Sequence, residues 1–198
     1  VKIIGVGSYA PETVISNEDI SKIVDTNDEW IESRTGIKTR HIVSGNETGV
    51  SLAIEATKDA LGFAGIKAED LECIIVATSL PDNLYPSTAC ELQREIGAFN
   101  AIAFDIVAAC SGLVYALSMA TQYIKTGCYK NALIVGVDIH SRFLDWTDRT
   151  TCVLFGDGAG AMILESDDEM TNNDILSIDL RADGRKGKEL SIPLAGKN

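Results

Sequence analysis

Apolar stretches alternate with helical patterns through the centre of this chain. Three stretches are almost continuously apolar, as strands buried on both faces of a sheet are, and they cover residues 71–78, 101–107 and 131–139. Between and around them, apolar residues recur at the spacing of one helix face, which predicts helices over residues 49–64, from the capping residue Thr88 to Gly97, and over residues 112–126. Strands that alternate with helices predict right-handed crossovers and a mostly parallel sheet covered on both faces.

Shorter elements precede this pattern. Residues 2–6 are predicted to form a strand, and Ser16 or Asn17 caps a helix that follows it. Residues 26–29 read as a capping box, in which side chains satisfy the first backbone N–H groups of a helix, so a second short helix is predicted to begin at Thr26.

Two strands are predicted to follow the last apolar stretch, over residues 151–155 and 159–164. Their connection is too short for a crossover helix, so we expect them to pair as antiparallel neighbours. The predicted class is therefore α/β, with one βαβαβαββ-type unit in a layered fold.

The acidic, non-periodic stretch after these strands is typical of a linker. We predict an amino-terminal unit over residues 1–166, a linker over residues 167–174, and a second unit that begins in residues 175–198. The first strand of that second unit is expected over residues 175–180.

Composition excludes some classes of function. The net charge of -12 argues against nucleic-acid binding, because such proteins meet phosphates with a basic surface. No apolar run is long enough to cross a bilayer, so no membrane association is expected.

Cysteine usage narrows the choice further. The five cysteines are odd in number and none lies at CxxC spacing, which disfavours both a disulfide framework and a zinc site. We therefore expect no metal and a reducing, cytoplasmic compartment. The missing CxxC pair also argues against a thiol redox protein.

The strongest candidate for chemistry is Cys110. A buried strand ends and a long helix begins around it, in the segment FDIVAACSG. The helix dipole at such a turn stabilises a thiolate, and turn N–H groups hold an oxyanion. An equally weighted alternative is a buried cysteine at a packed strand–helix joint. His140 ends the next predicted strand, which makes it a candidate general base.

A second candidate is a basic cluster. Trp30 and Arg34 are four residues apart on one predicted helix and share a face, and Lys38, Arg40 and His41 follow in one loop. Tryptophan stacks on an aromatic base while arginine holds phosphate, so a nucleotide-bearing ligand such as coenzyme A suits this cluster. The favoured local alternative is a tryptophan that packs on its own scaffold beside solvated charges.

Four segments together resemble one family. They read IIGVGSYAPE, DTNDEWIESRTGIKTRH, FDIVAACSGLVYAL and TDRTTCVLFGDGAGA, and they follow in order along nearly the whole chain. This combination resembles beta-ketoacyl-acyl carrier protein synthase III, the thiolase-fold condensing enzyme that starts fatty-acid synthesis. The resemblance implies two similar α/β halves, of which this chain matches the first and the opening of the second.

The resemblance also implies roles for individual residues. Cys110 matches the acyl-enzyme nucleophile. Trp30 and Arg149 match the residues that sandwich the adenine of coenzyme A, and Thr26 and Arg34 match their neighbours in that site.

Three further positions match parts of the substrate pocket. Tyr85 matches a position, usually aromatic, that reaches across a homodimer to close the partner's acyl pocket. Leu113 stands where the family often has phenylalanine, and His140 stands at a commonly apolar pocket position. Both departures bear on acyl-chain preference.

The implied reaction has two steps. Cys110 takes an acetyl or other short acyl group from acyl-CoA, which is a substrate and not a permanently bound cofactor. Malonyl-acyl carrier protein then loses carbon dioxide, and its carbanion attacks the thioester. The family's catalytic His and Asn lie in its second half, outside the matched residues. The alternative is thus a non-catalytic half that only binds coenzyme A or dimerises.

Overall fold

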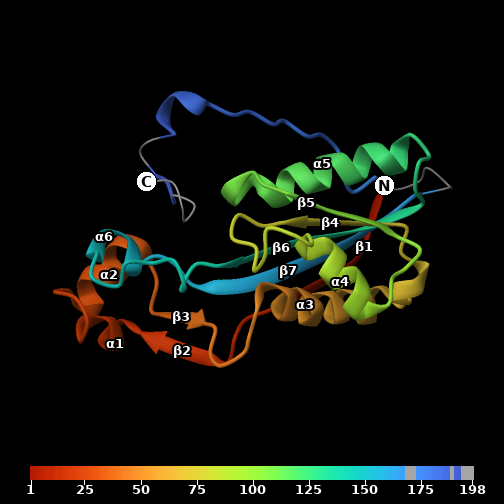
Figure 1. The fold of residues 1–198 in the computed structure, drawn as a ribbon. Helices are drawn as coiled ribbons and strands as arrows, with labels where there is room; N and C mark the ends of the chain where they lie inside the picture. Colours follow the sequence, from red (N-terminus) through yellow and green to blue (C-terminus); the bar gives the residue numbers. More distant parts are fainter. Residues whose placement is uncertain (168–172, 188–189, 193–198) are drawn as a thin grey trace.

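The centre of the fold is a five-stranded sheet with helices on both faces (Figure 1). The computed structural model describes residues 1–167, 173–187 and 190–192. In spatial order the sheet contains β1 (Lys2–Tyr9), β7 (Asp157–Glu165), β6 (Asn131–Ile139), β4 (Cys73–Ala77) and β5 (Ile102–Ile106). A separate sheet pairs β2 (Thr13–Ser16) with β3 (Thr39–Ile42). The helices are α1 (Asn17–Ser21), α2 (Asp28–Thr35), α3 (Gly49–Ala64), α4 (Thr88–Ile96), α5 (Gly112–Lys125) and α6 (Arg149–Cys152).

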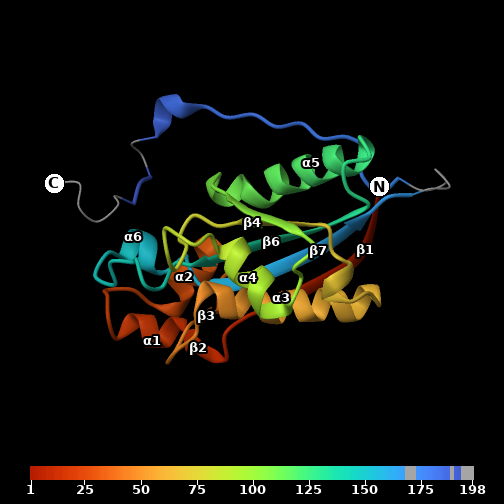
Figure 2. The same cartoon turned by 45° about the vertical axis from the view of Figure 1, so that its right-hand side comes forward.

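The helices form two layers around the large sheet. Figures 1 and 2 agree that α3 and α4 cover one face and α5 the other, and that residues 173–187 pass on the α5 side. The small sheet, α1, α2 and α6 gather beyond one end of the large sheet. Among the described residues, no helix is both long and apolar enough to cross a membrane.

The apolar pattern of β4 explains why it lies between two helical layers. Ile74 and Val76 belong to the core cluster under α3, whereas Cys73 and Ile75 belong to the cluster under α5. Because successive strand residues point to opposite faces, a strand buried on both sides must be apolar throughout. Burial of each such aliphatic side chain contributes about 1.5–3 kcal/mol. The α/β class is confirmed.

Strand direction decides where a site can form. β4 pairs in parallel with both β5 and β6, so the carboxyl ends of these strands meet at one edge. β7 runs antiparallel to β6 and to β1. The predicted antiparallel pairing of residues 151–155 with residues 159–164 is therefore wrong, because the antiparallel partners of β7 are β6 and β1.

The strand predicted over residues 151–155 is wrong. Residues 149–152 form the short helix α6, and the Asp148 side chain caps it by accepting from the backbone N–H of Thr150. The carbonyl of Val153, just after α6, accepts from buried Arg40. A cap on one side and a long-range bond on the other thus override the strand-like apolar run of residues 152–155.

Two predicted capping positions are displaced by one residue. Asn27, and not Thr26, caps α2 by accepting from the backbone N–H of Trp30. Ser87, and not Thr88, caps α4 by accepting from Cys90. In both places the chain offers adjacent capping side chains, and propensity alone does not choose between them.

The strand predicted over residues 175–180 is not observed, because these residues are assigned to neither a helix nor a strand. Most of the predicted linker, residues 168–172, lies outside the described residues. The division into two units therefore stays a prediction.

Two glycines of β1 allow α3 to lie directly on the sheet. A Cβ atom added at Gly7 would lie 2.2 Å from the carbonyl oxygen of Ala56, and one at Gly5 would lie 2.5 Å from that of Ala60. Both obstacles are helix backbone, which cannot turn aside. By contrast, Gly62 in α3 has open space around it.

We predict opposite effects for two alanine substitutions in the intact protein. Gly7→Ala forces α3 away from β1 and lowers the free energy of unfolding by roughly 2 kcal/mol or more, the scale of overpacking. Gly62→Ala raises it by about 0.5–1 kcal/mol through helix propensity. Denaturant unfolding measures both changes, and a Gly7→Ala midpoint equal to that of the natural protein contradicts the close contact.

Candidate active site

Cys110 lies where β5 gives way to α5. It is the central residue of a 3-10 turn, Ala109–Ser111, and its side chain is exposed. Ala109 has φ of 45° and is the one non-glycine among the described residues with positive φ. Such backbone costs on the order of 1–3 kcal/mol and concentrates at functional sites. The structure therefore favours a presented thiol over a cysteine buried in a packed joint.

Gly112 fixes the place of this turn on the sheet. A Cβ atom added there would lie 3.0 Å from the Cβ of Ala77, the last residue of β4. The start of α5 therefore touches the carboxyl end of β4, and Cys110 lies at the edge where the parallel strands end. Ligands of open α/β sheets bind at such edges.

The turn amides next to Cys110 are partly engaged. The N–H of Ser111 donates to Ala108 at 3.1 Å, and the N–H of Gly112 donates to Ala109. Because these two N–H groups already bond backbone carbonyls within the turn, they are not free to bind an oxyanion as the sequence suggested. The dipole of α5 still directs its positive end towards this turn.

Two strand carboxylates hold the neighbouring loop. Asp138 of β6 accepts from the backbone N–H of Ser79 at 2.8 Å and of Leu80 at 3.2 Å. Asp105 of β5 accepts from the backbone N–H groups of Thr88 and Ala89 at 2.8 and 2.7 Å. These bonds anchor both ends of the loop that carries Tyr85, whose side chain is 86% exposed.

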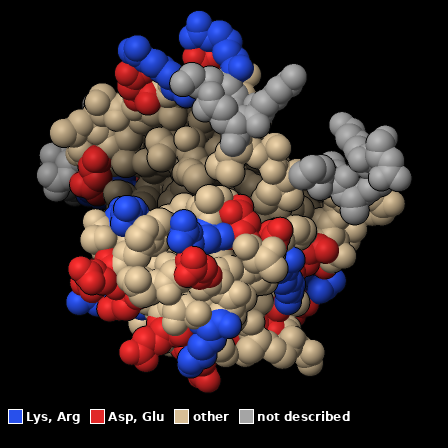
Figure 3. Space-filling view, turned by 90° about the vertical axis from the view of Figure 1, so that its left-hand side faces the viewer, with Lys and Arg blue, Asp and Glu red and all other residues tan. Residues whose placement is uncertain are grey.

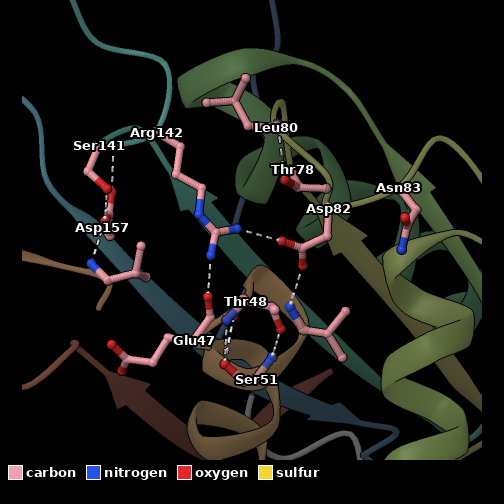
Figure 4. A network of polar contacts seen from close by, with 12 residues as sticks. Glu47, Thr48, Ser51, Thr78, Leu80, Asp82, Asn83, Ser141, Arg142 and Asp157 are labelled. Atoms are coloured by element: carbon pink, nitrogen blue, oxygen red, sulfur yellow. Dashed lines mark hydrogen bonds and ion pairs between the residues drawn. The ribbon is translucent and has the colours of Figure 1, made fainter. Parts of the chain in front are cut away.

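A further network ties this loop to its neighbours (Figure 4). Arg142, after β6, ion-pairs with Asp82 at 3.2 Å and donates to the carbonyl of Glu47. Asp82 also accepts from the backbone N–H of Val50 at the start of α3. Three loops that are distant in sequence are thereby joined at the edge that holds Cys110. The sequence did not point to Asp82 or Arg142. It did offer a signal for Asp105 and Asp138, because a carboxylate inside an apolar strand needs hydrogen-bond partners.

The two predicted acyl-pocket residues lie around β6. Leu113 faces Gly136, since a Cβ atom added at Gly136 would lie 3.6 Å from a methyl carbon of Leu113. His140 stacks on Phe155 with ring centroids 4.8 Å apart. Among the described residues, no hydrogen bond joins His140 to Cys110, so the structure gives no support to His140 as a general base.

The residues predicted to hold adenine come from α6, from α2 and from the chain just before α2, at the left-hand end of the molecule in Figure 1. The space-filling view of that end shows basic and acidic side chains interspersed (Figure 3). The guanidinium of Arg34 lies 4.5 Å from the ring centroid of Trp30, and that of Arg149 lies 4.9 Å from it. Arg149 also donates to the carbonyl of Asp25 at 2.8 Å. The hydroxyl of nearby Thr26 is buried without a hydrogen-bond partner among the described residues, which suits a ligand contact.

The rest of the predicted basic cluster does not join this group. Lys38 ion-pairs with Glu32 at 3.0 Å. Arg40 is only 5% exposed, and the ring of His41 bonds the carbonyl of Pro11. The prediction that Lys38, Arg40 and His41 lie in one loop and belong to the basic cluster is wrong for Arg40 and His41, because both lie in β3 and Arg40 points inward.

A shallow pocket of 360 Å³ lies between the small sheet and the loop after β6. Ser141, Arg142 and Trp146 form part of its wall, but Cys110 and Trp30 do not. Its lining contains no nucleophilic thiol or titratable base, so this pocket offers no alternative to Cys110 as the candidate nucleophile.

Comparison with known proteins bears on the assignment. The sequence profile of the family 3-oxoacyl-[acyl-carrier-protein (ACP)] synthase III matches residues 104–184. A beta-ketoacyl-[acyl-carrier-protein] synthase III from Xylella fastidiosa is 53% identical over 193 residues, which are 98% of this chain and 59% of that protein. The resemblance to the synthase III family is confirmed. The chain thus spans about three fifths of that relative.

Solved synthase III structures share the fold. The enzyme from Thermus thermophilus matches with a TM-score of 0.92 at 39% identity, over 98% of this chain and 60% of that one. The enzyme from Aquifex aeolicus matches with a TM-score of 0.82 at 50% identity, over 84% and 54% of the two chains. The layered fold of synthase III is therefore present here.

We predict that iodoacetamide at pH 8 labels Cys110 first in the intact protein. Cys73 and Cys152 are buried, and burial raises the pKa of Cys73 to about 12 and raises that of Cys152. A pKa raised far above pH 8 leaves almost no reactive thiolate. Peptide mass spectrometry ranks the rates, with the exposed thiols Cys90 and Cys128 as controls; faster labelling at either control contradicts the assignment.

Proposed function

We propose that the protein containing this chain catalyses the condensation that starts fatty-acid synthesis, with Cys110 as acyl acceptor. The observation that carries the proposal is the exposed thiol on a strained turn at the start of α5. The similarity to synthase III enzymes supports the reaction class.

The first step is an exchange of thioesters. The thiolate of Cys110 attacks the carbonyl carbon of a short acyl-CoA, with acetyl-CoA as the expected donor. A tetrahedral oxyanion forms and collapses, the bond to the sulfur of coenzyme A breaks, and the coenzyme A thiolate leaves and takes a proton. The dipole of α5 stabilises the attacking thiolate.

The second step forms the carbon–carbon bond. Malonyl-acyl carrier protein loses carbon dioxide, and the electron pair left on its α-carbon attacks the acyl-Cys110 carbonyl. The carbon–sulfur bond breaks, the β-ketoacyl chain stays on the carrier protein, and the thiolate of Cys110 returns. By family resemblance, a His and an Asn of the second half polarise the malonyl thioester.

Coenzyme A is proposed to bind at Trp30. For an adenine ring to stack between them, the Trp30 ring and the Arg149 guanidinium must lie about 7 Å apart, which is twice the ordinary contact distance of about 3.5 Å. We call this space the adenine slot. The present separation of 4.9 Å is a direct cation–π contact, so adenine has to displace the Arg149 guanidinium. Arg34 and the unpartnered hydroxyl of Thr26 would contact the nucleotide beside this slot.

The acyl chain is proposed to lie near Leu113 and His140. Leucine leaves more room than the phenylalanine common at position 113 in the family, whereas the imidazole of His140 places a polar ring, stacked on Phe155, at a commonly apolar position. Position 113 therefore admits a bulkier acyl group than phenylalanine would, and His140 favours an acyl end that tolerates a polar neighbour.

We predict that Cys110→Ala abolishes covalent labelling by radiolabelled acetyl-CoA in the intact protein, because no other thiol lies at the start of α5. Cys128→Ala removes an equally exposed thiol and should leave labelling unchanged. Label retained by Cys110→Ala overturns the nucleophile. An absence of label even in the natural protein favours the alternative, a half that only binds coenzyme A or dimerises.

A homodimer is also proposed. β5 is an edge strand of the sheet, and an exposed edge readily pairs with another chain. Apolar side chains surround it, since Val107 is 76% and Tyr85 86% exposed. Pairing of two β5 edges would bury these side chains and bring Tyr85 towards the partner's site.

We predict that the intact protein sediments at twice its protomer mass and that Val107→Asp shifts it towards the monomer. The matched control is Phe63→Asp, which places the same charge on a 73% exposed apolar position of α3 and should leave the mass unchanged. Dissociation by both variants, or by neither, contradicts an interface at β5.

A further inference from the structure

Arg40 of β3 is a buried cation whose partners are all neutral. Its Nη2 donates to Oδ1 of Asn17 at 2.9 Å and to the carbonyl of Val153 at 3.0 Å, and its Nη1 donates to the carbonyl of Ile15 at 3.4 Å. Its Nε has no hydrogen-bond partner among the described residues. Burial lowers the pKa of Arg40, because the charged form is the one that loses hydration.

A buried charge without a counter-ion is costly. The bonds of Arg40 offset part of this cost and join separate elements of the fold. Asn17, only 1% exposed, passes the link onward: its Nδ2 donates to Oδ1 of Asp28 and to the carbonyl of Ile37, each at 2.7 Å. Asp28 is the first residue of α2, the helix that carries Trp30. Arg40 and Asn17 therefore connect to the base of the adenine slot.

The other end of the link holds α6. Val153, whose carbonyl accepts from Arg40, is the residue that caps the carboxyl end of α6. Arg149 is the first residue of the same four-residue helix. A rotation of α6 about the anchor at Val153 therefore moves Arg149, at the opposite end, relative to Trp30.

The surroundings leave little slack in this link. The buried side chains of Ile31, from α2, and of Cys152 and Val153 form one small core, against which Trp30 packs. A Cβ atom added at Gly156 would lie 2.9 Å from the carbonyl of His41 and 3.2 Å from the Cβ of Arg40. The chain that leaves α6 thus passes directly against β3, so a change in the length of the Arg40 side chain is transmitted to α6.

We propose that Arg40 and Asn17 are positioning residues that set the separation of α2 and α6, and with it the width of the slot between Trp30 and Arg149. The inference rests on the proposed coenzyme A site and deepens it. It assigns specificity for the adenine nucleotide part of the donor to a pair of buried residues that do not touch the donor.

The test compares two acetyl donors in the intact enzyme. Acetyl-CoA carries the adenine nucleotide, whereas acetyl-N-acetylcysteamine has the same reactive thioester without it. Arg40→Lys keeps the charge but loses the planar fork that spans two acceptors. We expect a roughly tenfold rise in KM for acetyl-CoA, the scale of one lost charge-assisted contact, with kcat unchanged and with no change in either constant for acetyl-N-acetylcysteamine.

Controls separate this outcome from a folding defect. Arg94→Lys makes the same change at an exposed arginine of α4, whose partner is Glu95, and should alter neither donor. Asn17→Ala is the second variant: it keeps Arg40 but cuts the link to α2, and should reproduce the donor-selective rise in KM. Should Arg40→Lys fail to fold, Asn17→Ala decides the question.

Trp30→Ala distinguishes failure of this inference from failure of the proposed site. In one outcome, Trp30→Ala raises KM for acetyl-CoA alone, whereas the Arg40 and Asn17 variants affect both donors equally or not at all. This outcome overturns the positioning role but leaves the coenzyme A site supported. Equal effects of Trp30→Ala on both donors overturn the coenzyme A site, and the positioning role with it. Donor-selective losses in all three variants support the inference.

Discussion

The contact between the start of α5 and the end of β4 decides where the exposed thiol of Cys110 lies. Gly112 permits this contact, since a Cβ atom there would lie 3.0 Å from that of Ala77. With the helix start held against the sheet, the short turn that carries Cys110 has little room to move. The thiol of Cys110, the start of α5 and the carboxyl ends of three parallel strands therefore lie at one place. The proposed acyl transfer depends on this arrangement.

Two strand carboxylates support this arrangement through bonds to backbone N–H groups. Asp105 and Asp138 end or interrupt apolar strands, and each accepts two backbone N–H groups from the loop around Tyr85. Backbone donors satisfy a half-buried carboxylate while fixing the loop that supplies them.

Much of the fold was predictable from sequence, because strands buried on both faces and helices with one apolar face leave clear periodic signals. The continuous apolar character of β4 and β6 and the turn at Cys110 were read correctly. The errors occurred where long-range contacts override local pattern. Residues 151–155 are almost continuously apolar, like a buried strand, but a cap from Asp148 and a bond from Arg40 to Val153 make them end a helix. Arg40 was expected to be exposed, because it lies among the polar residues of the segment IKTRH. That sequence does not show that β3 points its side chain inward.

The neutral surroundings of Arg40 have a consequence for ionic strength. Mobile ions screen exposed charges within about 10 Å at 0.1 M salt, but they do not reach a guanidinium that is 5% exposed. At the proposed coenzyme A site, salt would therefore weaken the attraction of Arg34 and Arg149 for the phosphates of the ligand while it leaves the spacing of their helices intact. The proposed coenzyme A site around Trp30 thus keeps its shape at salt concentrations that screen its exposed charges. Its geometry and its electrostatics respond to the solvent separately.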